Sequence, residues 1–230
     1  ETVKNRIKSG EKKGILGVNI GPNKDTKDQK NDFCLGLKNF CNLADYITIN
    51  ISSPNTEGLR DFHEQEKLKD LLFALNKIKE NNKTNIPLLL KISPDIKDNY
   101  VAEIVDVAIK NSISAIILTN TTNGNRNTLL SKFKDEEGGL SGKPLQKIST
   151  DMIKKFYKQL NGKIPIIGVG GVNSGKSAYE KIAAGASLIQ LYTGLVYKGP
   201  SIAKEIKKEL IQILKSDGIK NIKDLIGKDI

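Results

Sequence analysis

Six short runs of apolar residues recur along the chain, and a segment of helical periodicity follows each of them. Several runs are apolar at consecutive positions, which is typical of parallel strands covered on both faces. The predicted strands are Ile15–Ile20, Tyr46–Ile51, Leu88–Ile92, Ala115–Thr119, Ile166–Val169 and Leu188–Tyr192. The predicted helices are Asn31–Asn42, Lys67–Glu80, Tyr100–Asn111, Ser149–Leu160, Ser177–Ala184 and Ser201–Leu214. This strict alternation indicates parallel β/α units, and no linker divides them, so we expect a single domain over residues 1–230.

Polar residues and glycines gather directly after the carboxyl ends of these predicted strands. Taken singly, such residues are ordinary turn formers. In a TIM (β/α)₈ barrel, however, the active site lies at this end of every strand. The clusters are Asn19–Gly21, Asn50–Thr56, Lys91, Thr119–Thr122, Gly170–Gly171 and Tyr192–Gly194. Because six independent strands place polar groups at the same pole, we predict a barrel fold with a functional site there.

Two of the predicted strand-to-helix connections are unusually long. They are Ser52–Glu66 and Thr122–Lys147, and each is a candidate lid over the site. For the middle of the second connection, a disordered surface segment is the alternative. That connection ends in the sequence GGLSGKP, where glycines allow the backbone to approach a ligand closely.

A phosphate site is expected near the C-terminal end of the chain. Gly170 and Gly171 follow a strand and precede a helix whose N-cap should be Asn173 or Ser174, and helix starts bind phosphate through backbone N–H groups. Barrel phosphate sites follow strands 7 and 8, so the last two predicted strands correspond to those and the first corresponds to strand 3. We therefore expect strands 3–8 in this chain, with strands 1 and 2 missing and no pairing between its first and last strands.

Composition excludes several classes of function. The net charge of +11 comes from lysines spread over nearly every polar helix face without interleaved aromatic residues, so we expect no nucleic-acid partner. Two cysteines, Cys34 and Cys41, match no metal-binding spacing and are expected to be free thiols. With His63 as the one histidine, we expect no metal site.

The motifs at the strand ends, taken in order, resemble those of the dihydroorotate dehydrogenases, specifically the membrane-associated, quinone-using class 2. The matching segments are LGVNIGPNK, ADYITINISSPNTEGLR, LLLKISPD, AIILTNTT, GGLSGKPL, PIIGVGGV and KIAAGASLIQLYTGL. Soluble class 1 enzymes carry cysteine as the base at the second position of the Ser-Ser pair, where this chain has Ser53. The resemblance implies an FMN-dependent barrel enzyme that oxidises dihydroorotate to orotate in pyrimidine (UMP) biosynthesis, with ubiquinone or menaquinone as electron acceptor.

The resemblance also implies roles for individual residues. Ser53 would take a proton from C5 of dihydroorotate while a hydride leaves C6 for the flavin. A serine is a weak base, so its proton must move onward through water or a hydroxyl such as that of Thr56. Strand parity groups Ser52 with Asn50 and does not itself select Ser53, and we expect a structural role for Ser52. The implied substrate-binding residues are Asn50, Asn55, Asn120 and Thr121.

The implied flavin-binding residues are Asn19, Asn50, Lys91, Thr119, Gly142, Gly171, Tyr192 and Thr193. Carboxamides suit the substrate, whose ring alternates N–H and C=O groups. Lys91 ends an apolar strand and needs an anionic partner, which a reduced flavin supplies. Gly142, Gly171 and the backbone of Tyr192 and Thr193 would cradle the phosphate.

The chain departs from the class 2 pattern at its N-terminal side. A membrane-binding helical segment that lines the quinone tunnel, followed by strands 1 and 2, would be expected there. The resemblance implies peripheral membrane association through that missing segment, at the cytoplasmic face of a bacterial inner membrane or at the mitochondrial inner membrane.

Two other functions remain as alternatives. A tRNA-dihydrouridine synthase-like flavin barrel would use a catalytic cysteine after the equivalent strand, and neither Cys34 nor Cys41 is there. A non-catalytic, phosphate-binding barrel remnant is the other alternative. The intact Ser53, Lys91 and four asparagines argue against such decay.

Overall fold

Six parallel strands form one sheet in the order of the sequence. The computed structural model describes residues 1–11, 13–124, 126–127 and 129–230. The strands are β1 (Gly17–Ile20), β2 (Tyr46–Asn50), β3 (Leu88–Ile92), β4 (Ala115–Leu118), β5 (Ile166–Val169) and β6 (Ala186–Gln190). Each strand pairs in parallel with the next, so β1 and β6 are the edges and do not pair with each other within the described residues. This open sheet confirms the prediction of a partial TIM barrel.

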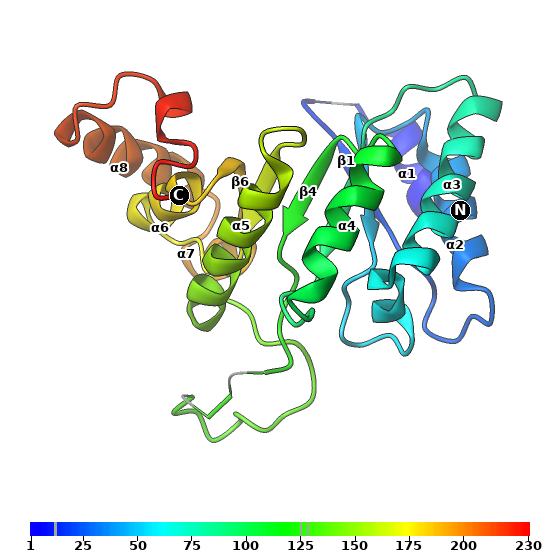
Figure 1. Cartoon of the computed structure of the whole chain (residues 1–230), viewed down its shortest axis with the longest axis horizontal. Helices are drawn as coiled ribbons and strands as arrows, with labels where there is room; N and C mark the ends of the chain where they lie inside the picture. The colour runs from blue at the N-terminus through cyan, green and yellow to red at the C-terminus, as the bar shows by residue number, and fades with distance from the viewer. Residues whose placement is uncertain (12, 125, 128) are drawn as a thin grey trace.

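Helices pack against one face of this sheet, with α4 and α5 in front of it in Figure 1. The α-helices are α1 (Thr2–Ser9), α2 (Gln29–Phe40), α3 (Gln65–Asn81), α4 (Asn99–Lys110), α5 (Gln146–Leu160), α6 (Gly175–Ala183), α7 (Thr193–Lys198) and α8 (Ile202–Ser216). Short 3₁₀ helices are η1 (Leu59–His63), η2 (Lys143–Leu145) and η3 (Ile222–Leu225). All six predicted helices are present, and their ends differ from the prediction by three residues or fewer. Among the described residues, no helix combines the length and apolar character needed to cross a membrane.

The sequence pattern is wrong about the last strand and misses two helices. It places that strand at Leu188–Tyr192, two residues too late, because the apolar run continues beyond β6. Tyr192 is instead the N-cap of α7. Both α7 and α1 lack buried residues, so neither carries the apolar stripe from which a helix is predicted.

Alternate side chains along each strand point to opposite faces of the sheet. Alternate residues such as Ile47, Ile49, Leu88 and Leu90 join the large apolar core between the sheet and its helices. The other face of the sheet carries a smaller apolar cluster of Leu89, Ala115, Ile117 and Ile167. At the carboxyl end of this second face the strand positions become polar. This arrangement, apolar below and polar at the mouth, creates the candidate site.

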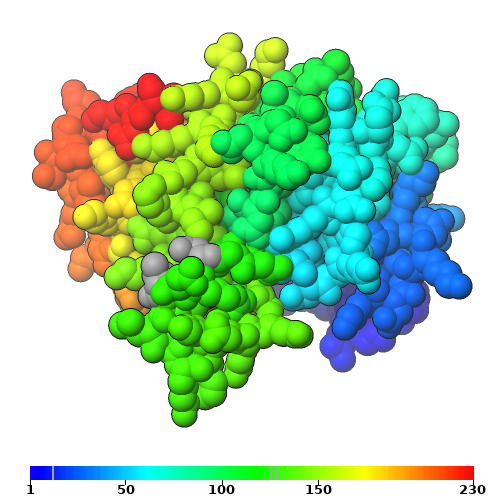
Figure 2. Space-filling view, turned by 60° about the horizontal axis from the view of Figure 1, so that its bottom comes forward, coloured from blue at the N-terminus to red at the C-terminus, as the bar shows by residue number. Residues whose placement is uncertain are grey.

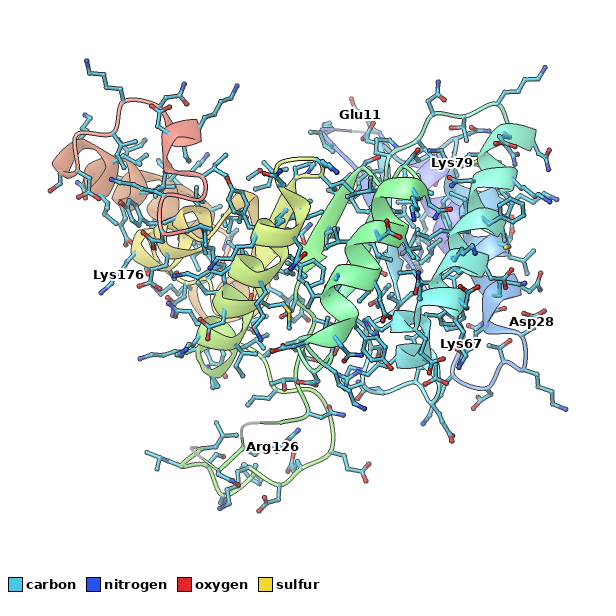
Figure 3. The ribbon with its side chains drawn as sticks, viewed as in Figure 1. Glu11, Asp28, Lys67, Lys79, Arg126 and Lys176 are labelled. Carbon is cyan, nitrogen blue, oxygen red and sulfur yellow. The ribbon has the colours of Figure 1, made fainter. Side chains whose placement is uncertain are left out.

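The connection between β4 and α5 projects beyond the carboxyl ends of the strands as a lobe, residues 123–139 (Figures 1 and 2). An antiparallel bridge between Thr122 and Leu140 closes its neck. Inside the lobe, the Arg126 guanidinium donates to the carbonyl oxygens of Lys134 and Glu136, each at 2.8 Å, and to that of Gly138 (Figure 3). The described part of the lobe is thus organised around one arginine. Asn125 and Thr128, within the segment predicted as a lid or as disordered, lie outside the described residues.

Candidate active site

A cavity of about 380 Å³ opens at the carboxyl ends of β3 to β6. Its wall includes most of the residues that the family resemblance singles out. These are Lys91, Thr119, Asn120, Thr121, Gly142, Gly171, Tyr192 and Thr193. They come from four strand ends and from the base of the lobe, and Lys91 and Thr193 are 102 positions apart in sequence. From the sequence, these residues could be grouped only because each follows a predicted strand. The structure brings them together around one cavity.

Strand register explains why some of these side chains share a face. Asn50 pairs with Lys91, and Lys91 pairs with Ile117, which lies on the face opposite the helix-covered core. Thr119 follows Ile117 by two positions and continues that face. Asn19 lies on the edge strand β1, where it pairs with Thr48 of β2. Its side chain is exposed and does not belong to the cavity wall.

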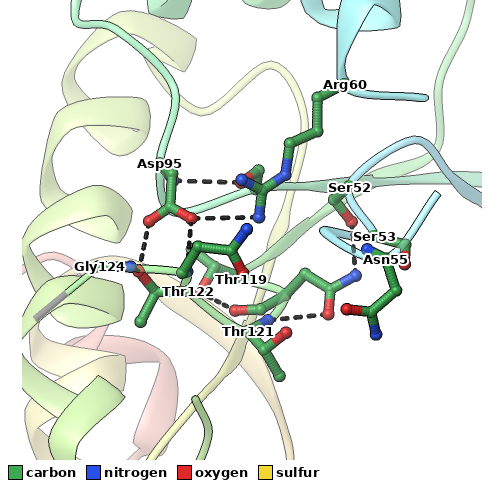
Figure 4. A network of polar contacts seen from close by, with 12 residues as sticks. Ser52, Ser53, Asn55, Arg60, Asp95, Thr119, Thr121, Thr122 and Gly124 are labelled. Carbon is green, nitrogen blue, oxygen red and sulfur yellow. Dashed lines mark hydrogen bonds and ion pairs between the residues drawn. The ribbon is translucent and has the colours of Figure 1, made fainter. Parts of the chain in front are cut away.

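A network of short hydrogen bonds fixes the carboxamides at the ends of β2 and β4 (Figure 4). The Ser52 hydroxyl donates to Asn50 Oδ1 at 2.8 Å, and Asn120 Nδ2 donates to Ser52 Oγ at 2.9 Å and to Asn50 Oδ1 at 3.2 Å. Asn120 Oδ1 accepts the N–H of Thr121 at 2.8 Å. Ser52 is completely buried, as suits its expected structural role. The network leaves the Asn50 amide nitrogen available to a ligand.

Ser53 lies beside this network on the β2–η1 loop, half-buried and outside the lining of the cavity. Its Oγ accepts the backbone N–H of Asn55 at 3.3 Å, which leaves the hydroxyl hydrogen and a second lone pair for another partner. Asn55 is exposed and lines a neighbouring groove together with Pro54, Asn123 and Arg126. Thus Asn50, Ser53 and Asn55 all lie outside the lining of the main cavity, whereas Asn120, which is hydrogen-bonded to Asn50, lies within it.

Lys91 gives the cavity a positive charge. Its side chain is half-buried, and burial lowers its pKa from the ordinary 10.5. Within the part of the chain that the structure describes, no carboxylate forms an ion pair with it. A partly desolvated ammonium without a counter-ion favours an anionic ligand, because such a ligand restores the lost stabilisation of its charge.

Two glycines shape the opposite wall. Gly142 has φ +77° and Gly171 has φ +74°, a region that residues with a Cβ rarely adopt. A Cβ on Gly171 would lie 2.5 Å from the Cβ of Gln146 and 2.9 Å from its backbone nitrogen. No hydrogen bond among the described residues uses the N–H groups of Gly171 or Thr193. This wall therefore suits a phosphate, which binds to unpaired backbone N–H groups.

The start of α6 offers fewer free donors than the sequence suggests. Ser174 is the N-cap, one of the two residues predicted, and forms a capping box with Ser177. The N–H groups of Asn173 and Ser174 both donate to Ser177 Oγ at 3.0 Å, and that of Gly175 donates to Glu209 at 2.5 Å. Because side chains of the protein occupy these N–H groups, a phosphate must rely on the residues before the helix.

Sequence reasoning missed a buried lysine beneath the glycines. Lys181 on α6 is fully buried, and burial lowers its pKa to about 8. Its ammonium donates to Ser149 Oγ at 2.9 Å and to Thr150 Oγ1 at 3.2 Å. Ser149 in turn donates to the carbonyl oxygen of Val169, which also accepts the Thr119 N–H at 3.0 Å. The available signal was a lysine at an apolar position of a short helix, three residues after Ala178.

An acidic residue after β3 was also missed. Asp95 accepts the hydroxyl of Thr122 and the N–H of Asn123, the latter at 3.0 Å, and lies 3.1 Å from Arg60 Nη2. Its signal was its position in the sequence KISPD, where only Lys91 was counted among the polar residues of the strand end. Cys34 and Cys41 are free thiols, as predicted.

Comparison with known proteins identifies the family. Residues 1–214 match the family model described as dihydroorotate dehydrogenase. The chain is 44% identical over 228 residues to a Bartonella tribocorum protein named dihydroorotate dehydrogenase (quinone), covering 97% of this chain and 63% of that protein. It is 44% identical over 230 residues to the mitochondrial protein of that name from Arabidopsis thaliana, covering 97% of this chain and 50% of the relative.

Solved structures agree with this. The structure of an Eimeria tenella protein described as DHODH in complex with ferulenol superimposes with a TM-score of 0.90 and 38% identity, covering 99% of this chain and 65% of that one. The ligand-free form gives a TM-score of 0.89, also at 38% identity, and covers 99% and 68%. The match spans 63% of the length of the Bartonella tribocorum protein and 50% of the length of the Arabidopsis thaliana protein. On this sequence and structural similarity, the chain belongs to the dihydroorotate dehydrogenase family.

Proposed function

We propose that the protein oxidises dihydroorotate to orotate in pyrimidine biosynthesis, with FMN as cofactor and a membrane quinone as electron acceptor. The observation that carries this proposal is the cavity at the carboxyl ends of β3 to β6. Its wall combines an unpaired ammonium, carboxamides and glycine backbone in a chain 44% identical to a protein named dihydroorotate dehydrogenase (quinone). Those three kinds of group suit an anionic flavin, a substrate ring with alternating N–H and C=O groups, and a phosphate.

Ser53 is the proposed general base. Its hydroxyl would accept the proton from C5 of dihydroorotate and pass its own proton to water or to Thr56, which lies in the same loop. Asn50, Asn55, Asn120 and Thr121 would hold the substrate. Ser52 and Asn120 support this step indirectly, because their hydrogen bonds fix the orientation of the Asn50 carboxamide. Bound FMN would supply the acceptor for the hydride that leaves C6.

The residues proposed to bind FMN are Asn19, Asn50, Lys91, Thr119, Gly142, Gly171, Tyr192 and Thr193. Lys91 would stabilise negative charge on the reduced ring, consistent with the burial that lowers its pKa. Gly171 and Thr193 would offer unpaired N–H groups to the phosphate. The close approach of Gly171 to Gln146 supports this part of the proposal, since any side chain there would displace the backbone.

Quinone use and membrane association are parts of the same proposal. They rest on serine at the position of Ser53 and on relatives named dihydroorotate dehydrogenase (quinone), from bacteria and from a mitochondrion. The protein would act as a peripheral membrane protein, at the cytoplasmic face of a bacterial inner membrane or at the mitochondrial inner membrane. The electron acceptor would be ubiquinone or menaquinone.

The test uses the purified full-length protein. We expect it to be yellow with bound FMN, to bleach when dihydroorotate is added without oxygen, and to regain its colour on addition of a soluble quinone analogue. Bound flavin that dihydroorotate does not reduce would overturn the proposed substrate. Flavin that bleaches but recovers with fumarate or NAD and not with quinone would overturn the proposed acceptor.

A further inference from the structure

Three segments that are distant in sequence meet at the Asp95 carboxylate (Figure 4). Arg60 of η1 lies 3.1 Å from Oδ2, and the Asn123 N–H donates to Oδ2 at 3.0 Å. The Thr122 hydroxyl donates to Oδ1. Arg60 lies in η1, directly after the loop that carries Ser53, whereas Thr122 forms the neck of the lobe after β4 and Asn123 begins the lobe itself. One side chain thus joins both of the long connections at the mouth of the site.

This ion pair differs from the other ion pairs of the described chain in its burial. The Arg60 and Asp95 side chains are 28% and 25% exposed, whereas the Lys30–Asp70 and Lys155–Asp98 pairs are 44% or more exposed. The Arg60 Nε and Nη2 atoms are buried without a well-aligned hydrogen bond to any described residue. Arg60 is therefore held by charge attraction at short range, which solvent screens less than at the surface.

The carboxylate acts at the neck of the lobe. Thr122 and Leu140 exchange backbone hydrogen bonds of 3.2 and 2.7 Å, and the Thr122 hydroxyl also accepts the Gly124 N–H at 3.0 Å. The preceding residue, Thr121, is tied through its N–H to Asn120. The position of the neck therefore sets the position of two of the proposed substrate residues.

We propose that Asp95, paired with Arg60, is a positioning residue that fastens the neck of the lobe to the Ser53 loop and so holds Asn120 and Thr121 in place for the substrate. The inference rests on the proposed function for the identity of the substrate. We call the contacts of Asp95 with Arg60, Thr122 and Asn123 the latch, and these contacts do not depend on the identity of the substrate. Asp95 does not line the cavity, and among the described residues its hydrogen-bond and ion-pair partners include none of those proposed to bind FMN, so we expect its effect on substrate and not on flavin.

The test compares Asp95→Asn with Asp98→Asn in the full-length, FMN-loaded protein. Asp98 lies three residues away and pairs with Lys155 at the surface, so it is a matched control. For Asp95→Asn we expect the KM for dihydroorotate to rise about tenfold, as for loss of one charge-assisted hydrogen bond, with a smaller change in kcat and unchanged FMN content. Trypsin should also cut the lobe faster, at the exposed Lys132 and Lys134. Asp98→Asn should behave as wild type.

Two results would overturn the latch. One is an Asp95→Asn protein with wild-type KM and wild-type cleavage of the lobe, and the other is an equal effect of Asp98→Asn. If Asp95→Asn does not fold, Thr122→Val is the second variant: at a buried position it removes the hydroxyl bond to Asp95, together with the bond from the Gly124 N–H, and leaves the Arg60–Asp95 pair in place. It must show the same two changes, a higher KM and faster cleavage of the lobe, to a smaller extent. If dihydroorotate fails to reduce even the wild-type flavin, the proposed function is wrong, and cleavage of the lobe still decides whether the latch exists.

Discussion

The two sides of the cavity are built in different ways. We call Asn50, Ser52, Ser53, Asn120 and Thr121 the substrate rim. There the side chains of Asn50, Ser52 and Asn120 hydrogen-bond to one another across two strand ends. We call Gly142, Gly170 and Gly171 the glycine cradle, and there the backbone itself is the surface. The rim depends on polar side chains, which can be recognised directly in the sequence. The cradle depends on the absence of side chains and on what packs behind it.

The difference has an energetic side. Each hydrogen bond in the rim contributes on the order of 1 kcal/mol, so single changes there should leave the architecture intact. In the cradle, a Cβ on Gly170 would lie 3.0 Å from that of Ser149, and one on Gly171 would meet Gln146 at 2.5 Å. Changes there must move the backbone. We therefore expect rim variants to lose chemistry while they keep flavin, and cradle variants to lose flavin.

The largest effect is expected at the rim. Ser53→Ala should lower the rate of flavin reduction by dihydroorotate ~10²–10⁴-fold, the usual contribution of a general base, while FMN stays bound. Anaerobic stopped-flow measurement of flavin bleaching gives this rate, and absorbance gives the flavin content. Thr56→Val in the same loop is the control for proton relay, with a smaller loss. A Ser53→Ala rate within about threefold of wild type would remove Ser53 from the role of base.

The cradle should respond in the opposite sense. Gly171→Ala should weaken FMN binding at least about tenfold, since the added methyl group meets the backbone of Gln146. Gly162→Ala is a matched control, because Gly162 has the same φ of +74° and nothing within 4 Å of its would-be Cβ. That control should lose about 1 kcal/mol of stability from backbone strain and keep its flavin. Equal flavin affinity in both variants would show that the close approach to Gln146 is not what shapes the cradle.

A smaller effect is expected from the support beneath the cradle. Lys181→Met keeps the apolar stem of a fully buried side chain and removes its charge, so folding should be nearly unchanged. FMN binding should weaken roughly fivefold, because a cation behind the phosphate site attracts the phosphate through a medium of low dielectric constant. Flavin titrations at two salt concentrations measure this, with Lys176→Met on the exposed side of α6 as control. Identical affinities for the two variants would make Lys181 a packing residue only.

Much of the site could be predicted from sequence because barrels place strand ends at one pole. Lys91 and Thr119 are grouped at that pole because they stand at strand ends, and the motif after β2 marks the rim. The Arg60–Asp95 pair could not be predicted, because hydrophobic periodicity gives no information on which of many charged residues meet across 35 positions. The burial of Lys181 has one signal in the sequence, its apolar position on α6, but periodicity does not show which groups its ammonium meets. At the start of α6, the Gly175 N–H is occupied by Glu209 of α8, a contact that only the fold creates.

His63 provides the smallest test, and it also concerns the rim. It is 3% exposed, its Nδ1 lies 2.7 Å from the carbonyl oxygen of Arg60, and its Nε2 accepts the Ser93 N–H at 3.3 Å. These partners require a neutral ring with its hydrogen on Nδ1, since a carbonyl accepts and an N–H donates. The imidazole thereby joins η1 to the end of β3. Burial lowers its pKa from 6.5 to about 4.

The sign of the pH dependence follows from that shift. Above pH 6.5 both the folded and the unfolded chain carry neutral His63, so it gives no pH dependence. As the pH falls below 6.5, the unfolded chain binds a proton that the folded chain excludes until about pH 4, so stability is lost over that window. At pH 5.5 the loss should be about 1.4 kcal/mol. Urea denaturation at pH 7.5 and 5.5 measures this loss. The variant His63→Gln should be less stable at pH 7.5 but should lack the additional loss at pH 5.5, because glutamine does not titrate. Carboxylates that titrate over this range affect both proteins equally and cancel in the comparison.

Hydrogen exchange at pH 5.5 should rise first in η1 and the Ser53 loop and last around Gly171. An additional loss at pH 5.5 that persists in His63→Gln, or exchange that rises first at the cradle, would show that acid does not act on the rim through this histidine.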